Sequence, residues 1–155
     1  MSAAQRPITL DTPLGDALLF HAMQGGEAVS QLFDYEVSAV STNARISATD
    51  LLGKPLKVSM QLGDGQPRWF HGVCVAFGID GNVGRYHRYR LTLRPWLWLL
   101  TRSSNLRIFQ DKTVLEIVKS VFGEHTSNFV DETGGRYPVR KYCVQYRESD
   151  FNFVS

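Results

Sequence analysis

The chain has 155 residues, of which 43% are hydrophobic and 12% aromatic, and its formal net charge is +2. That length is enough for one domain with a full core, or for one domain and part of another. The 17 Lys and Arg residues are scattered along the chain and nearly balanced by acidic residues, so we expect no nucleic-acid partner.

Targeting signals are weak throughout the sequence. The opening segment MSAAQRPITLDTPLG has no apolar stretch of the kind found in secretory signal peptides. The longest apolar run, residues 96–100, is far below the roughly 20 residues that span a bilayer. Cys74 and Cys143 are too few for a disulfide framework and indicate reduced thiols. We therefore expect neither a signal peptide nor stable membrane insertion.

Strand signals dominate the chain up to residue 95. Residues 33–39 alternate between apolar and polar side chains, as do residues 56–62, which is the pattern of a half-buried strand. Asp80 and Gly81 lie between two apolar runs and indicate a β-hairpin. About six such strands at short spacing predict a small antiparallel β-barrel.

Pro95 ends the last of these strands. Proline cannot donate to a sheet ladder, but its fixed φ suits the start of a helix, so residues 95–101 are predicted to form a short helical turn. Apolar side chains surround this turn on all sides, which favours a plug that closes one end of the barrel. An aromatic ligand pocket is the alternative. The residues expected in the core are Trp96, Trp98, Leu99 and Leu100.

The clearest helix is predicted for residues 113–122. Thr113 and Glu116 have the spacing of a capping box, and Gly123 follows as a stop signal. The apolar residues recur on one face, which we expect to be buried. That face consists of Val114, Ile117, Val118, Val121 and Phe122.

An irregular stretch, residues 125–138, separates this helix from one more alternating strand at residues 139–146. Ser149 then has the character of an N-cap that opens another helix. The fold class expected is therefore mainly β with minor α. We expect residues 1–104 to form the barrel and residues 105–155 to begin a further, incomplete subdomain.

The sequence offers no convincing catalytic or metal site. His71 and Cys74 are three residues apart in a predicted strand, which places them on opposite faces, and His71 is expected opposite Leu93 and away from His87. Cys143 lies in an alternating strand with no oxyanion loop beside it. The glycine-rich segments lead into strands and not into a helix N-terminus. We expect no enzyme activity, metal or cofactor.

Two long stretches, LTLRPWLWLLTRSSNLRIFQDKT and YCVQYRESDFNFVS, resemble the VgrG family, the valine-glycine repeat spike proteins of type VI secretion systems. DTPLGDALLF, LFDYEVSAVS, LLGKPLKVSM and WFHGVCVAFG are similar to the same family in the same order. The resemblance covers essentially the whole chain. It implies a fold of the contractile-phage tail-hub type, with related β-barrels and smaller domains between them.

The resemblance also implies a structural role. Family members form homotrimers whose hub docks on the hexameric tube protein Hcp, and they assemble in the bacterial cytoplasm before contraction carries them out of the cell to deliver effectors. It implies no catalytic residue in the hub region. We expect the 155-residue chain alone to be monomeric. A tail hub protein of a contractile phage, or a ligand-binding module using Trp96 and Trp98, are the alternatives.

Overall fold

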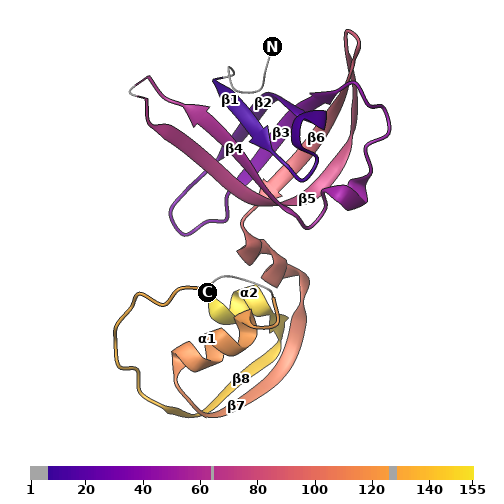
Figure 1. Ribbon diagram of the computed structural model, residues 1–155. Helices are drawn as coiled ribbons and strands as arrows, with labels where there is room; N and C mark the ends of the chain where they lie inside the picture. The colour runs from indigo at the N-terminus through magenta and orange to yellow at the C-terminus, as the bar shows by residue number, and fades with distance from the viewer. Residues whose placement is uncertain (1–6, 64, 126–128) are drawn as a thin grey trace. The chain divides into compact units, whose positions relative to one another are not determined.

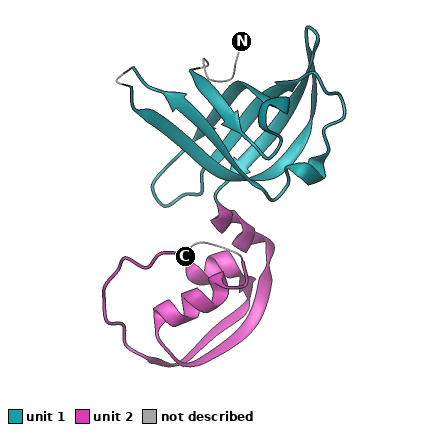
Figure 2. Cartoon of the chain, in the orientation of Figure 1, with its two compact units in different colours: residues 1–95 teal, residues 96–155 magenta. Residues whose placement is uncertain are grey.

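The computed structural model describes residues 7–63, 65–125 and 129–155 (Figure 1). Antiparallel strands dominate and the helices are few and short, which confirms the expected β-rich fold class. The chain divides into two compact units, residues 1–95 and 96–155 (Figure 2).

The first unit is one curled antiparallel sheet. Its order is β1-β4-β5-β6-β3-β2, so β1 and β2 are the two edge strands and the sheet forms an open half-barrel (Figure 1). The predicted number of strands is confirmed. Their bounds are β1 Ile8–Asp11, β2 Leu19–Gly26, β3 Asp34–Ser41, β4 Pro55–Gln61, β5 Pro67–Val83 and β6 Tyr86–Arg94.

Alternating side chains of these strands build the first core. In β3, Tyr35, Val37 and Ala39 are buried, and the residues between them lie on the outer face of the sheet. The ring of Tyr89 is also fully buried, and its hydroxyl donates to the carbonyl oxygen of Asn43 at 2.7 Å. This bond satisfies the polar end of a large core residue, as burial requires.

The β5–β6 hairpin is present, but its turn lies further along the chain than Asp80–Gly81 suggested. Val83 pairs with Tyr86, so Gly84 and Arg85 form the two-residue loop, and Gly84 has the positive φ of 58° that such loops need. A register shift at residues 79–82 makes Gly81 part of a bulge. The position of the turn, with this shift and a second one between Cys74 and Ala76, makes the expected pairing of His71 with Leu93 wrong.

Cys74 occupies that position opposite Leu93, and His71 pairs instead with Lys57 on β4. The hairpin itself was predicted correctly, but its turn lies further along the chain and two register shifts interrupt β5, so the cross-strand partners differ from those expected.

The second unit packs two short helices against a strand pair. It contains a 3-10 helix at Trp96–Arg102, β7 Ser104–Lys112, α1 Val114–Phe122, β8 Arg140–Ser149 and α2 Asp150–Val154. The strands β7 and β8 are antiparallel, and the described residues 129–139 that precede β8 are irregular, as expected. Residues 126–128 of that stretch lie outside the described part of the chain.

Local capping explains where the two helices begin. The Thr113 hydroxyl accepts from the backbone N–H of Glu116, and the Glu116 carboxylate accepts from the N–H of Thr113 at 2.7 Å, so the predicted capping box is confirmed. Ser149 likewise accepts from the N–H of Asn152 and begins α2.

A second core lies in this unit, around the buried Leu100, Phe109, Ile117 and Val121. Leu100 belongs to the 3-10 helix. We expected this helix in the barrel region, residues 1–104, as a plug at one end of the barrel. Contacts divide the chain at Pro95 instead, because the side chains of this helix pack with Phe109 and with α1 and α2.

Two glycines of β5 offer a test of the half-barrel. A Cβ at Gly72 would lie 2.9 Å from Leu93 Cβ and 3.2 Å from the carbonyl oxygen of Arg94, whereas a Cβ at Gly78 would meet nothing within 4 Å. We expect Gly72→Ala to lower the free energy of unfolding by about 1–3 kcal/mol through overpacking. Gly78→Ala should change it by less than about 1 kcal/mol. Urea denaturation of both variants measures the difference, and equal effects would contradict this register.

Candidate functional site

A buried carboxylate in the second unit holds together a large network of hydrogen bonds among the described residues. Asp150, the first residue of α2, has no exposed surface. Its Oδ1 accepts from Arg107 Nη1 at 2.5 Å and from Gln145 Nε2 at 2.8 Å. Its Oδ2 accepts from Ser103 Oγ at 2.7 Å. Asn105 Nδ2 lies 3.0 and 3.2 Å from the two oxygens.

The same network continues to the residues that follow α1. His125 Nε2 lies 3.2 Å from Asp150 Oδ2. Arg107 uses its second terminal nitrogen for an ion pair with the exposed carboxylate of Glu124, and its first also donates to Gln145 Oε1 at 2.7 Å. One carboxylate thus connects β7, β8, α2 and the end of α1.

Two opposing effects act on the pKa of Asp150. Burial alone raises the pKa of a carboxyl, because it disfavours the charged form. Hydrogen bonds from Arg107, Gln145, Asn105 and Ser103 favour the charged form, and together they hold the pKa of Asp150 well below its ordinary value. The group is therefore a permanent buried anion at neutral pH.

This geometry supports a structural role and not a catalytic one. A nucleophilic serine needs its hydroxyl hydrogen-bonded to a base such as histidine. Here the hydroxyl of Ser103 donates to Asp150 Oδ2, and His125 Nε2 lies near that same oxygen atom, with no hydrogen bond between His125 and the hydroxyl among the described residues. Arg107, Gln145, Asn105 and Ser103 all donate to the Asp150 carboxylate, so the cluster neutralises one buried charge.

The cysteines offer no nucleophile pair either. Burial raises the pKa of Cys74 to about 11, against a smaller opposing effect of its hydrogen bond to the carbonyl oxygen of Ala76. Cys143 is half-buried in β8 and packs against the second core. Within the described ranges no group of three or more His, Cys, Asp and Glu side chains could hold a metal ion.

A second polar site lies on the outer face of the first unit. Asp80 forms ion pairs with Arg88 at 3.1 Å and with Arg90 at 2.7 Å. Arg90 also lies 3.7 Å from Glu36, which accepts from Gln24 Nε2 at 3.2 Å. These contacts run across β5, β6, β3 and β2. Exposed pairs of this kind contribute little stability one by one, but together they give the sheet a patterned outer surface.

A shallow cavity of about 260 Å³ adjoins this row of ion pairs. Ser38 contributes a buried hydroxyl oxygen that has no hydrogen-bond partner among the described residues. The polar residues that line the cavity are His21, Gln24, Glu36, Ser38, Asp80 and Arg88.

The residues predicted to form the core around residue 100 and α1 divide into three groups. Leu100, Ile117 and Val121 are buried. The half-buried residues are Trp96, Trp98, Val118 and Phe122. Leu99 and Val114 are each 36% exposed, so placing them in the core was wrong.

The two exposed residues have a physical explanation. A 3-10 helix that packs on one core cannot bury side chains on all of its sides, and Leu99 is the residue left outside. Val114 is the first residue of α1, at the end of the buried face. By contrast, the Trp96 ring packs edge-on against Phe122 with centroids 5.0 Å apart, which favours a core role over a ligand pocket.

Sequence reasoning missed the Asp150 cluster. Its members are separated by up to 47 residues, as between Ser103 and Asp150, and form no motif. The available signal was a polar pattern: Arg107 in β7 and Gln145 in β8 stand at positions that alternate with apolar residues. Polar residues at the inward positions of two paired strands indicate a buried polar network between them.

The fold is thus a β-rich module whose polar clusters join its strands and helices. The family of phage tail baseplate hub (GPD) proteins matches residues 26–155, and the chain belongs to this family. Its relatives are type VI secretion system spike proteins of the VgrG type.

Those relatives are similar over nearly the whole chain. The spike proteins VgrG1a and VgrG1b of Pseudomonas aeruginosa are 44% and 43% identical to it, over 97% and 100% of its length. The actin cross-linking toxin VgrG1 of Vibrio cholerae is 36% identical over 79% of the chain. The chain spans only 24%, 22% and 11% of these three proteins.

Solved structures show the same fold. An Escherichia coli component of the type VI secretion system, described as similar to the T4 tail proteins gp27 and gp5, matches with a TM-score of 0.71 and 28% identity. The match covers 97% of this chain and 39% of that one. A tail protein of Neisseria meningitidis matches with a TM-score of 0.57 and 12% identity, over 96% and 43% of the two chains. No helix in the described residues is both long and apolar enough to cross a membrane.

Asp150 provides the test of the buried cluster. Asp150→Asn removes the charge that neutralises Arg107 and should lower the free energy of unfolding of the second unit by about 3–5 kcal/mol. The matched control is Glu124→Gln, which removes the exposed carboxylate from the same guanidinium and should cost less than about 1 kcal/mol. Urea denaturation at pH 7 measures both, and similar losses would contradict the central role of Asp150.

The same carboxylate predicts a pH dependence. Because its pKa is lowered on folding, its contribution to stability is fully present above the unfolded value of about 3.9 and is lost as pH falls below it. Between pH 5 and pH 2 the wild-type protein should therefore lose more stability than Asp150→Asn does. Parallel losses in the two proteins would contradict this assignment.

Proposed function

We propose that this chain forms part of the hub of a type VI secretion spike. In the full-length protein it trimerises, docks on a hexameric tube protein of the Hcp type, and travels with the spike when contraction delivers effectors. The observation that carries this proposal is the match of fold over 97% of the chain to a known component of that machinery.

The structure supports a mechanical role in two ways. Each unit has its own tightly packed core, and packed protein interiors have low compressibility. The buried ion pair and the row of surface ion pairs add directional contacts that resist sliding of one strand against another. A part that transmits force needs both properties.

The proposal includes a cellular route. The spike assembles in the bacterial cytoplasm and leaves the cell through the contractile machinery, so it needs no signal peptide or membrane-spanning helix of its own. A role without enzymatic activity for this region is part of the proposal, and it rests on the similarity to spike and tail-hub proteins.

Docking on the tube is tested by sedimentation. We expect the full-length protein to form a trimer by light scattering and to sediment with assembled tubes of the Hcp-type protein. The 155-residue chain should be monomeric and should bind the same tubes at least about 100-fold more weakly, because a single contact loses the avidity of the assembled hub. A full-length protein that fails to bind tubes, or a stable trimer of this chain alone, would contradict the proposal.

A further inference from the structure

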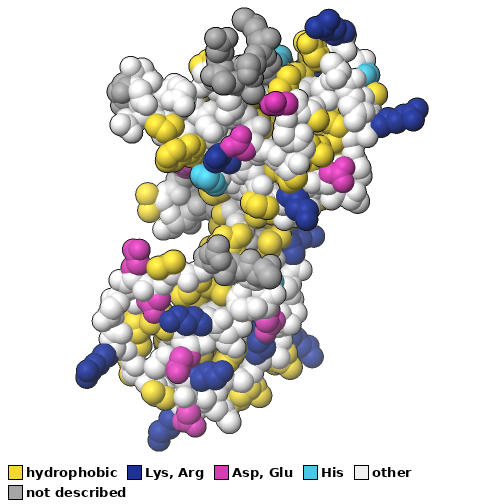
Figure 3. Space-filling model, viewed as in Figure 1, with side chains coloured by type: hydrophobic (Ala, Val, Ile, Leu, Met, Phe, Trp, Pro, Cys, Tyr) yellow, Lys and Arg dark blue, Asp and Glu magenta, His cyan; other side chains and the backbone are white. Residues whose placement is uncertain are grey.

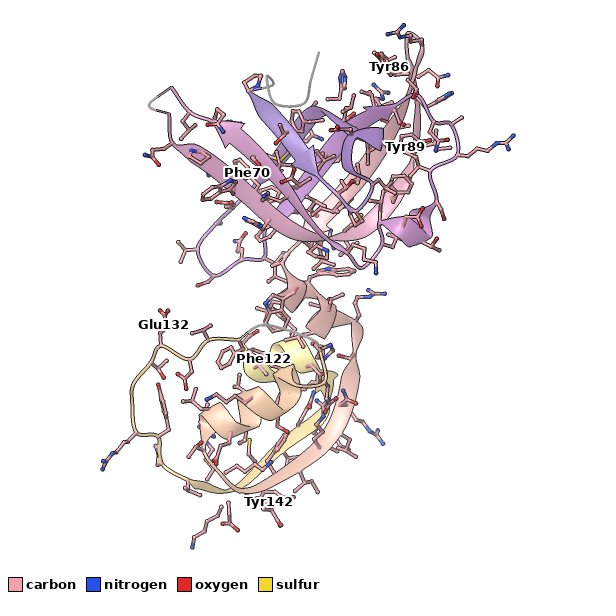
Figure 4. The ribbon with its side chains drawn as sticks, in the orientation of Figure 1. Phe70, Tyr86, Tyr89, Phe122, Glu132 and Tyr142 are labelled. Carbon is pink, nitrogen blue, oxygen red and sulfur yellow. The ribbon has the colours of Figure 1, made fainter. Side chains whose placement is uncertain are left out.

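One of the three tryptophans lies exposed on the outer face of the first unit. Trp69 on β5 is 56% exposed, whereas Trp96 and Trp98 are half-buried. Its neighbour Phe70, labelled in Figure 4, packs against the first core, where its ring meets that of Tyr35 edge-on with centroids 5.5 Å apart. Because side chains alternate along a strand, the indole of Trp69 stands on the opposite, outer side of the sheet.

The indole of Trp69 has no partner in the part of the chain that the structure describes. Neither its ring nor its N–H group contacts another described residue through a hydrogen bond, a ring contact or a cation. A tryptophan side chain combines a large apolar body with one polar N–H donor. An open indole therefore suits a ligand that has both an apolar face and hydrogen-bonding groups.

Hydroxyl groups lie beside the indole on the same face. Trp69 pairs directly with Ser59 on β4, and Ser59 pairs directly with Thr9 on β1. Directly paired residues share a face of the sheet, with Cβ atoms about 5 Å apart. The indole and two hydroxyl groups thus form one row across three strands.

A second row on this face carries an ion pair and an imidazole. It lies two residues further along each strand, where His71 pairs with Lys57 and Lys57 pairs with Asp11. Lys57 Nζ lies 2.8 Å from Asp11 Oδ2. We call the six residues of the two rows the Trp69 face: Thr9, Ser59, Trp69, Asp11, Lys57 and His71.

A cavity of about 300 Å³ adjoins the second row. Asp11, Lys57 and His71 all line it, together with Pro13 and Pro55. This volume is at the lower end of the range for small-molecule sites. The Trp69 face thus joins an open aromatic ring to a cavity with three polar side chains.

The composition of the face selects the chemistry of the ligand. The charges of Asp11 and Lys57 cancel, so the face does not favour a strongly charged ligand such as a phosphate. Trp69 is its one large apolar side chain, whereas the centre of a protein interface is rich in apolar residues and poor in charges. A pyranose ring has C–H groups on a flat face and hydroxyls at its edge, so it can stack on the indole while it bonds to Ser59 and His71.

We propose that the Trp69 face binds a saccharide, a chain of β-linked pyranose rings. One ring stacks on the indole and exchanges hydrogen bonds with Ser59 and His71, and the next ring enters the cavity beside Asp11 and Lys57. A β-1,4-linked chain with equatorial substituents is flat, so its rings can follow the surface of a sheet. The site goes beyond the proposed hub function, because it needs neither a tube nor a second copy of the chain.

The probes are cellohexaose and chitohexaose, two β-1,4-linked chains that differ in the acetamido group. In a ¹⁵N-HSQC titration of the 155-residue chain, at least one of them should move the indole N–H signal of Trp69, with half-saturation on the order of 1 mM. The signals of Trp96 and Trp98 should stay in place. Sorbitol, which has hydroxyls but no ring, should move none of the three. The signal absent from Trp69→Ala identifies the indole of Trp69.

Variants separate stacking from hydrogen bonding. Trp69→Ala should weaken binding at least about tenfold, whereas Trp69→Tyr keeps an aromatic ring and should stay within about threefold of the wild type. His71→Ala should weaken binding about threefold through a lost hydrogen bond. The matched control is Tyr142→Ala, because Tyr142 is an aromatic residue of β8 with 60% exposure, and its replacement should leave binding unchanged.

The full-length protein is tested by sedimentation with insoluble cellulose and chitin particles. The wild type should sediment with the polymer whose hexasaccharide binds, and Trp69→Ala should sediment at least about fivefold less. Equal sedimentation of the two proteins would overturn the proposal, because the rest of the protein would then cover the indole.

Three other results would also overturn it. Neither hexasaccharide moves the Trp69 signal, or sorbitol moves it as far as they do. Light scattering shows that Trp69→Ala disrupts the assembly of the full-length protein, which would make the indole a contact between copies. The sedimentation assay with Hcp-type tubes is independent of all these outcomes, so failure of this site is distinguishable from failure of the hub function.

Discussion

A carboxylate with no exposed surface needs a positive charge and hydrogen-bond donors beside it. The groups that supply them to Asp150 come from segments that are distant in sequence. Arg107 supplies the charge, Ser103 and Asn105 approach from the start of β7, and Gln145 approaches from β8. These contacts hold the strand pair, α2 and the end of α1 around one carboxylate. The arrangement of the second unit therefore depends on this single anion.

The outer surface of the unit follows from the same contact. Because Arg107 and Gln145 point inward, their neighbours Leu106 and Tyr146 point outward, and an apolar strip stays exposed. The first unit does the reverse, with apolar residues inside and ion pairs on the outer face of its sheet. Hydrophobic and charged side chains are interspersed over the face shown in Figure 3. The two units thus offer different surfaces.

Local signals in the sequence predicted the elements well. The Thr113 capping box, the Ser149 N-cap and the helix-starting role of Pro95 all depend on residues within a few positions of one another. Long-range features were not predictable in this way. The position of the turn and two bulges set the register of β5 and β6, and the Asp150 cluster joins residues more than forty positions apart. The 3-10 helix after Pro95 was recognised, but which of the two cores it joins depends on contacts that no local pattern encodes.

Amide hydrogen exchange of the wild-type chain and of Asp150→Asn tests the dependence of the second unit on this anion most directly. The two units have separate cores, so loss of the buried charge should accelerate exchange in β7, β8 and α2 while β3, β5 and β6 keep their protection. Unchanged protection of β7 and β8 in Asp150→Asn, or an equal loss in both units, would contradict the account.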